Sequence, residues 1–319
     1  MNTAAAAFDS RHATRQRVRE TLFRGATLVA ALLVLTLLGG VVLSLLRGSW
    51  LAFSTFGFSF LTREIWNPVT DEYGALAPIY GTVVTSLIAM LLAIPISFGI
   101  AIFLTELAPS WLKRPVGVAI ELLAAVPSII FGIWGLFVLA PVLQRHVQPW
   151  LIENLGPLPF IGKLFHGPPF GIGVLTAGVV LAIMVLPFIA AVTRDVFETV
   201  PDVLKESGYG LGATTWEVIW KVVVPYSRSG IVGGIMLGLG RALGETMAVT
   251  IILSVSGIVT FNLISSGNPS TIAAHIALDF PESSGLDVNA LIAVGLVLFG
   301  VTLVINMAAR AIINREVRY

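Results

Sequence analysis

Long apolar runs separated by short polar segments make up most of this sequence. A helix of about 20 apolar residues is long enough to cross a bilayer, and every run reaches that length. The runs that we expect to span a membrane are 25–46, 73–105, 115–144 (which contains Glu121), 164–193, 229–256 (which contains Arg241 and Glu245) and 288–309. The pattern therefore predicts an all-α fold, a polytopic membrane bundle of six transmembrane helices.

The composition agrees with this class of protein. Of the 319 residues, 56% are hydrophobic and 12% are charged, whereas a soluble domain carries about 25% charged residues. The chain has no Cys, and its four His residues are scattered singly, so we expect no disulfide, no thiol chemistry and no metal site. The net charge of +1 does not favour a nucleic-acid partner, and membrane lipid is the expected surrounding.

The positive charges predict the orientation of the helices. Fourteen of the 19 Lys and Arg residues lie on one side of the predicted spans, four lie on the other side, and Arg241 lies within a span. Because positively charged loops stay in the cytoplasm, both termini are expected there. The outer loops would then be 47–72, 145–163 and 257–287, and loops of this length are expected to contain short helices or re-entrant pieces.

We expect two parts in the chain: a basic cytoplasmic arm over residues 1–24 and a six-span domain over 25–319. Within the second part, residues 194–228 form the one sizeable cytoplasmic loop after the arm, and their pattern predicts two short helices separated by glycines. The second helix begins at Thr214, since Thr214 and Glu217 have the spacing of a capping box. Pro225 is expected to end it.

The face of this second helix leaves two interpretations open. Trp216, Ile219, Trp220 and Val223 share one apolar face. Such a helix can lie in the lipid headgroup layer with its tryptophans as anchors. It can also be the surface on which a partner protein docks, which would explain why the loop is more structured than a linker requires.

Arg241 and Glu245 are charged residues placed about midway across the fifth predicted span. A charge at the bilayer centre costs about 2.5 to 3.5 kcal/mol on insertion scales, so the pair needs an explanation. On a continuous helix, both residues would share one face with Gly234 and Gly238. The pattern predicts a helix face that is both small and charged.

Two roles for this pair follow from its chemistry. In the first, Arg241 and Glu245 form an ion pair between closely packed helices, although Arg before Glu is the less favourable order along a helix. In the second, Arg241 presents its forked donors to an oxyanion crossing the membrane, while Glu245 accepts a hydrogen bond from the substrate or holds Arg241. A charge within a membrane helix is by default a candidate site, so we favour the substrate path. For Glu121 we expect a structural role.

The cytoplasmic loop resembles the loop with the Glu-Ala-Ala motif in permease subunits of ABC importers. The match consists of Glu-Ser-Gly at 206–208, Gly212 four residues further on, and Val-x-Val-Pro at 222–225, all at the spacing of that motif. In that family the loop fits a groove on the ATP-hydrolysing subunit. The resemblance therefore implies an ATPase-docking loop that includes Glu206, Gly208, Gly212, Thr214, Glu217 and Pro225.

Four further blocks resemble the PstC-type permease subunits of bacterial phosphate importers. They are YGALAPIYGT at 73–82, FGIAIFLTELAP at 98–109, ELLAAVPS at 121–128 and GGIMLGLGRALGETMA at 233–248. The resemblance implies the fold of a type I ABC-importer permease in a bacterial inner membrane. It also implies a function, which is to form the path for inorganic phosphate into the cytoplasm.

The same resemblance implies three kinds of protein partner: a homologous second permease subunit (PstA-type), an ATPase dimer (PstB-type) and an external phosphate-binding protein (PstS-type). Two alternatives stay open. One is an ABC permease for another oxyanion, such as sulfate or molybdate. The other is an ion-coupled secondary carrier that uses Arg241 and Glu245 as its anion and proton site, although we find no inverted repeat in the sequence to support it.

The sequence contains no loop suited to binding the phosphates of ATP. The nearest string, at 156–164, has one residue too many between its glycines, and Leu164 stands where Ser or Thr would hold magnesium. We therefore expect a non-catalytic transport subunit that binds no cofactor itself, with ATP and Mg²⁺ used by the partner ATPase.

Overall fold

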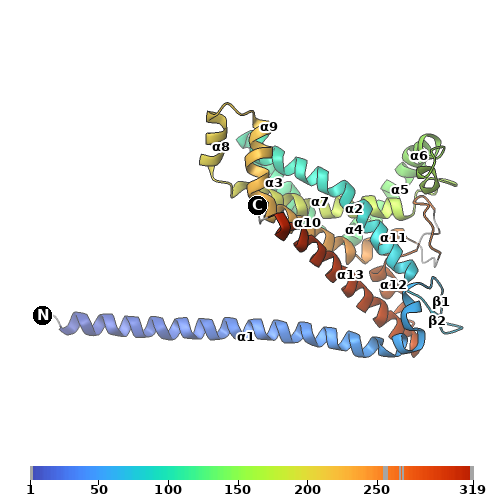
Figure 1. Ribbon diagram of the computed structural model, residues 1–319, viewed down its shortest axis with the longest axis horizontal. Helices are drawn as coiled ribbons and strands as arrows, with labels where there is room; N and C mark the ends of the chain where they lie inside the picture. Colours follow the sequence, from blue (N-terminus) through green and yellow to red (C-terminus); the bar gives the residue numbers. More distant parts are fainter. Residues whose placement is uncertain (1–2, 254–257, 266, 268, 317–319) are drawn as a thin grey trace.

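The computed structural model describes residues 3–253, 258–265, 267 and 269–316, and nearly all of its regular structure is helical (Figure 1). The elements are α1 (Thr3–Phe56), η1 (Gly57–Leu61), β1 (Trp66–Asn67), β2 (Glu72–Tyr73), α2 (Leu76–Ile102), η2 (Phe103–Leu107), α3 (Ser110–Ala124), α4 (Ser128–Trp134), η3 (Gly135–Leu139), α5 (Ala140–Val142), η4 (Leu143–Val147), α6 (Gln148–Leu155), η5 (Ile161–Leu164), α7 (Val174–Glu198), α8 (Asp202–Gly210), α9 (Thr215–Val218), η6 (Ile219–Val223), α10 (Val224–Leu243), α11 (Met247–Ile252), α12 (Ile272–Asp279) and α13 (Leu286–Glu316). The predicted all-α class is confirmed.

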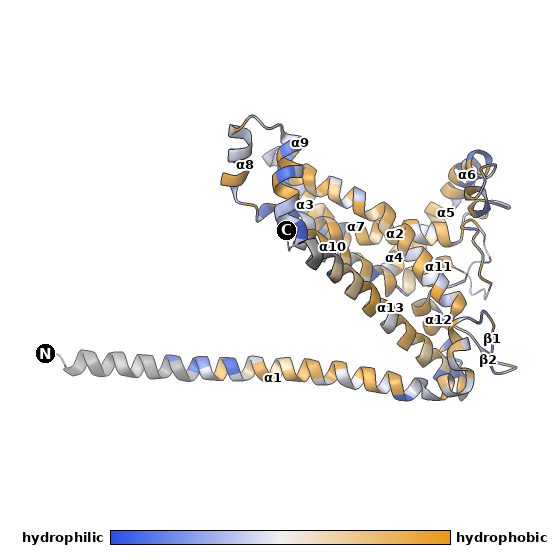
Figure 2. Ribbon diagram, viewed as in Figure 1, coloured by the Kyte–Doolittle hydropathy of each residue, from blue (hydrophilic) through white to orange (hydrophobic). Residues whose placement is uncertain are grey.

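Six helices in the described part of the chain are long and apolar enough to cross a membrane, as the sequence predicts. They are Arg19–Leu61, Leu76–Leu107, Ser128–Leu155, Val174–Glu198, Thr215–Leu243 and Leu286–Ala311. Figure 2 shows hydrophobic residues along α2 and α7, and more hydrophilic residues around α8 and α9. The structure therefore describes a multi-pass membrane protein.

The third span begins at Ser128 rather than at residue 115 as predicted. Helix α3 ends at Ala124, and Pro127 has an extended backbone, with φ −58° and ψ 137°, just before α4 begins. A proline lacks the amide that a helix needs and disfavours helical backbone in the residue before it. Pro127 therefore separates two helices, and Glu121 lies on the first of them, outside the span.

The fifth span also differs from the single helix predicted over 229–256. Helix α10 ends at Leu243, and a short helix, α11, begins at Met247; residues 254–256 lie outside the described residues. At the other end, Pro225 does not end a helix, because α9, η6 and α10 form one continuous helix. Within the π-helical η6 the amide of Val224 bonds to the carbonyl of Ile219, and this wider turn accommodates a proline that has no amide to donate.

Helices α2 and α7 pack along each other at the centre of the bundle, and α10 packs against both (Figure 1). The buried core between them consists mainly of alanine and branched aliphatic side chains. The Oγ of Ser97 on α2 donates to the Leu186 carbonyl of α7 at 2.9 Å. Small residues and cross-helix hydrogen bonds are the usual means of packing membrane helices, because lipid supplies little hydrophobic driving force between them.

The loops that are predicted to lie outside carry short elements, as expected. Helix α1 continues to Phe56, beyond the predicted start of the first outer loop at residue 47. It is followed by η1 and by the antiparallel hairpin of β1 and β2, in which Trp66 pairs with Tyr73. The predicted loop 145–163 contains all of α6 and most of η5, and the described part of 257–287 contains α12. Helix α1 contacts α13 near this side, where Asn289 Nδ2 donates to the Gly48 carbonyl at 2.6 Å, while the N-terminal part of α1 extends away from the other helices (Figure 1).

Candidate functional site

The two charged residues of the fifth span do not lie on one continuous helix. Arg241 is in the last turn of α10, whereas Glu245 lies in the break before α11. Glu245 is buried, with 8% of its surface exposed, and its Oε1 accepts a hydrogen bond from the Ala248 amide at 3.3 Å. Because the first amides of a helix favour a carboxylate, Glu245 caps α11. The predicted continuous face of glycines and charges is therefore wrong.

Arg241 contacts an aromatic ring instead of Glu245. Its guanidinium carbon lies 4.3 Å from the centroid of the Phe188 ring, near the middle of α7. Its buried Nε has no hydrogen-bond partner, and within the described ranges no ion pair joins Arg241 to Glu245. A buried donor without a partner is costly. Arg241 therefore has an unused buried donor near the end of the fifth span, and the packing ion pair is not formed.

The glycines of α10 divide into two groups. A Cβ added at Gly238 would lie 2.6 Å from Ile189 Cγ1, so this residue allows α10 to approach α7 closely. Gly234 faces α7 in the same way, with Val192 Cγ1 3.1 Å from the added atom. Gly240, in contrast, has no such neighbour within 4 Å. The first pair of glycines packs helices as predicted, and Gly240 lies on an open side of α10.

The predicted cytoplasmic loop, residues 194–228, contains two short helices joined by a glycine turn, and we call its part from 199 to 225 the docking segment. Helix α8 ends at Gly210, and α9 begins after Thr214, whose Oγ1 accepts from the Glu217 amide at 3.4 Å. The Glu217 carboxylate in turn accepts from the Thr214 amide at 3.1 Å. This is the predicted capping box, and Lys221 Nζ donates to Glu217 Oε1 at 3.0 Å one turn further along.

Two positions of this segment require glycine, and the structural reason differs between them. Gly212 has φ +84° and no atom within 4 Å of an added Cβ, so its backbone conformation, rather than crowding, requires glycine. Gly208 lies where α8 packs on the second helix, because a Cβ there would lie 3.1 Å from Val218 Cγ2. Both glycines therefore shape the turn that brings the two short helices together.

The outer surface of the docking segment is exposed and partly apolar. Glu206 is exposed, and in the described part of the chain its side chain has no hydrogen bond or ion pair. Leu211 is 90% exposed and Trp216 is 65% exposed, while Ile219 and Val223 are buried. The predicted apolar face of four residues is therefore divided, because η6 turns its aliphatic residues inward and leaves Trp216 outside.

Glu121 has the structural role that the sequence predicts. Its Oε1 lies 3.1 Å from Arg194 Nη2, and Arg194 also pairs with Asp195 at 2.8 Å. The Arg194 Nη1 would lie 2.8 Å from a Cβ at Gly117, so the guanidinium rests against the backbone of α3. This ion pair links α3 to the C-terminal end of α7.

A buried polar cluster joins two of the loops that are predicted to lie outside. His275 of α12 is 5% exposed, its ring centroid lies 4.3 Å from that of Trp66, and its Nδ1 lies 3.3 Å from Asp279 Oδ2. Burial lowers the pKa of His275 to about 4, although the charge of Asp287 acts in the opposite direction. Burial and Asp287 together raise the pKa of Tyr73 to about 12. His275 and Tyr73 are therefore neutral at pH 7.

Sequence reasoning missed three residues of interest. Phe188 is one of 18 phenylalanines in apolar surroundings, so nothing in the pattern distinguishes it. Glu106 and Lys205 form an ion pair of 2.6 Å between η2 and α8. Two features of the sequence could have drawn attention to this pair. Glu106 is the one charge in the block 98–109, and Lys205 directly precedes Glu206.

Comparisons with known proteins agree with this arrangement. The chain matches the family described as "Binding-protein-dependent transport system inner membrane component" over residues 94–319. A structure of a bacterial alginate ABC transporter, in complex with an alginate pentasaccharide-bound periplasmic protein, shares the fold with a TM-score of 0.59 at 17% identity, over 91% of this chain and 94% of that one. The fold is therefore that of a membrane subunit of an ABC transporter.

Closer relatives narrow the family. The chain is 60% identical over 297 residues to the phosphate transport system permease protein PstC of Pasteurella multocida, which covers 93% of this chain and 92% of that protein. It is 57% identical over 309 residues to the protein of the same name from Mesorhizobium japonicum, with coverage of 96% and 94%. The chain belongs to the family of phosphate transport system permease proteins PstC, a group of inner membrane components.

Proposed function

We propose that this chain is a permease subunit of an ATP-driven importer and forms part of the path by which inorganic phosphate enters the cytoplasm. Family membership supports the substrate, because the relatives are named as phosphate transport permeases. The observation that carries the proposed site is Arg241, whose guanidinium lies on the Phe188 ring and whose buried Nε has no hydrogen-bond partner.

The chemistry of Arg241 suits a tetrahedral oxyanion. A guanidinium offers donors in a planar fork that matches two oxygens of a phosphate. Phe188 covers one face of that plane at 4.3 Å, so the edges carrying the N–H groups stay available to a ligand. Glu245 stabilises the break between α10 and α11 by capping α11, and the break leaves Arg241 at the end of a helix instead of within one.

The cytoplasmic side supports docking of an ATPase. Helices α8 and α9 present Glu206, Leu211 and Trp216 to solvent at the tip of a rigid, capped turn. We assign this surface to the PstB-type ATPase dimer, which uses ATP and Mg²⁺, while this chain is the non-catalytic subunit. A PstA-type second permease and a PstS-type external phosphate-binding protein complete the proposed assembly, with both termini of this chain in the cytoplasm.

Phosphate uptake by the assembled complex tests the proposed path. Arg241→Lys keeps the charge but loses the fork, and Arg241→Gln loses both, so labelled-phosphate uptake should fall by about 100-fold or more in each variant while assembly persists. Arg145→Lys, at an exposed arginine in η4, is the matched control and should leave uptake unchanged. Normal uptake by assembled Arg241→Gln would overturn the path assignment.

A second measurement separates the importer from an ion-coupled carrier. Proteoliposomes that contain the two permeases, the ATPase and the binding protein should import phosphate only when ATP is supplied to the ATPase. Uptake driven by a proton or sodium gradient, with the permeases alone and without ATP, would support the secondary carrier instead. Competition of sulfate and molybdate with phosphate uptake shows which oxyanion the importer transports.

A further inference from the structure

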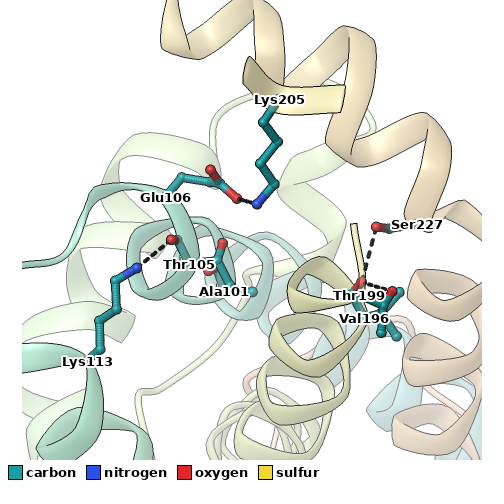
Figure 3. A network of polar contacts seen from close by, with 8 residues as sticks. All are labelled: Ala101, Thr105, Glu106, Lys113, Val196, Thr199, Lys205 and Ser227. Atoms are coloured by element: carbon teal, nitrogen blue, oxygen red, sulfur yellow. Dashed lines mark hydrogen bonds and ion pairs between the residues drawn. The ribbon is translucent and has the colours of Figure 1, made fainter. Parts of the chain in front are cut away.

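A buried ion pair connects the docking segment to the second membrane helix. Lys205 Nζ of α8 lies 2.6 Å from Glu106 Oε1 of η2, and only 15% and 7% of the two side chains are exposed. Figure 3 shows Lys205 reaching from α8 to Glu106 at the end of the helix that carries Ala101 and Thr105. This contact joins residues that are 99 positions apart in the chain.

Helix α8 has few other means of holding the membrane helices. None of its residues is fully buried, and it packs mainly on α9 and η6, the other half of the docking segment. Val203 is 70% exposed. The direct contact of α8 with α2 is therefore the pair of Lys205 and Glu106. The other half of the docking segment, α9 and η6, continues into α10 and contacts α2 through Trp220 and Phe98, whose ring centroids lie 5.8 Å apart.

The receiving end of the contact is firmly attached to the rest of the bundle. Lys113 Nζ of α3 donates to the Thr105 carbonyl at 2.7 Å, next to Glu106 (Figure 3). Further along, α2 is hydrogen-bonded to the Leu186 carbonyl of α7 through Ser97, two residues before the Phe188 ring on which Arg241 lies. A displacement of η2 is thus passed along α2 to α7, the helix whose Phe188 ring lies against Arg241.

A buried ion pair is suited to transmit force because it cannot be stretched cheaply. Separating the partners leaves a charge that is desolvated and uncompensated, which costs far more than breaking an exposed pair. The exposed pair of Lys221 and Glu217, in which 73% and 41% of the side chains are accessible, offers no such resistance.

We propose that Lys205 and Glu106 form the coupling contact through which ATP-driven movement of the docking segment is transmitted to α2 and so to the path. The inference rests on the proposed function, since it takes α8 to be the part that the ATPase moves. Both residues are positioning residues, because neither is assigned a contact with phosphate or with ATP.

The test uses the whole transporter with its ATPase and binding protein, reconstituted in proteoliposomes. In Lys205→Glu and in Glu106→Lys, the amount of phosphate imported per ATP hydrolysed should fall by about tenfold, because the contact becomes repulsive while the ATPase still docks. In the double variant Glu106→Lys with Lys205→Glu, the reversed pair should restore most of that ratio. The control Lys221→Gln removes the exposed pair of the same segment, leaves the capping box of Thr214 and Glu217 in place, and should change the ratio little.

A covalent version of the contact provides a second test, which applies even if the single-charge variants do not fold. Because the chain contains no native Cys, Glu106→Cys with Lys205→Cys introduces the only two thiols. This variant should be uncoupled when reduced and recover coupling when a short bifunctional thiol reagent joins the two positions. Recovery supports a transmitting contact, and equal coupling before and after cross-linking overturns it.

Failure of this inference differs from failure of the proposed function. If the wild-type chain does not bind an ATPase or import phosphate, the proposed function is wrong. If the ATPase binds and the single-charge variants keep the wild-type ratio of phosphate to ATP, only the coupling contact is wrong. A double variant that assembles but stays as uncoupled as the single variants would also overturn it.

Discussion

The guanidinium of Arg241 lies on the face of the Phe188 ring, with 4.3 Å between its central carbon and the ring centroid. The contact joins the last turn of α10 to the middle of α7, across two helices that pack closely at Gly238. It orients a charged group within the membrane without neutralising it. This differs from an ion pair, in which Glu245 would occupy the donors of Arg241.

The first prediction concerns the ring beneath the arginine. Phe188→Leu keeps an apolar side chain but removes the π face, so Arg241 should be less well oriented, and phosphate uptake should fall by about tenfold, as expected for a partly desolvated cation–π contact. Phe188→Tyr keeps the ring and should retain most of the uptake. If both variants transport equally well, the ring has no part in positioning Arg241. Assembly with the partners is measured alongside uptake.

The second prediction concerns packing of α10 on α7. Gly238→Ala places a methyl group 2.6 Å from Ile189 Cγ1, and such overpacking costs about 1–3 kcal/mol. We therefore expect a lower melting temperature for the purified chain in detergent. Gly240→Ala is the matched control, since no atom lies within 4 Å of the added carbon, and its melting temperature should be equal to or above that of the wild type. Equal melting temperatures would contradict the close packing.

The third prediction concerns the turn of the docking segment. Gly212 has φ +84°, so Gly212→Ala imposes a strain of about 1 kcal/mol on the turn. Co-purification of the ATPase should weaken several-fold, and Gly212→Asp should weaken it further. Gly210→Ala lies two residues away, without a positive φ and with open space around it, and should bind the ATPase normally. Undiminished ATPase binding by Gly212→Asp would show that this loop does not dock the ATPase.

The fourth prediction concerns pH. Burial lowers the pKa of His275 from 6.5 to about 4, so the unfolded chain takes up a proton before the folded chain does. The free energy of unfolding should therefore decrease as pH falls from about 6.5 to about 4. In His275→Gln this part of the decrease should be absent. Melting curves at several pH values check this, and parallel curves for the two proteins would argue against a buried neutral His275.

The fifth prediction concerns orientation. Reporter fusions after Lys113 and Lys205 should lie in the cytoplasm, and fusions after Asn67, Glu153 and Ser284 should lie outside. The fusion at Ser284 is the most informative, because it follows α12 and precedes the last span. A cytoplasmic signal there would require a different number of crossings.

Several features follow from local sequence alone. The six spans are visible in the sequence because each needs about 20 apolar residues in succession, and the capping box of Thr214 and Glu217 is visible because its spacing is fixed by one turn of helix. The turn at Gly212 is also foreseeable, since only a few residues in that loop permit such a backbone. These predictions depend only on residues a few positions apart, so the sequence contains all the information that they need.

Tertiary structure decided what the charges do. Arg241 and Glu245 are four positions apart and look like a helical pair, yet the helix ends between them, since Gly244 and the cap at Glu245 favour a new start at Met247. Pro127 ends a helix while Pro225 is accommodated within one, because η6 provides a wider turn there.

The partners of three charged residues lie far away along the chain: Arg241 on Phe188, Glu121 with Arg194, and Glu106 with Lys205. The sequence by itself determined that these charges are present and that they lie in or near the apolar runs. Which group each charge faces depends on how α2, α7, α8 and α10 pack. A buried charge is stable only beside a group that compensates it, and that group can come from any helix that packs nearby. That choice is made by packing between segments, and no local pattern in the sequence records it.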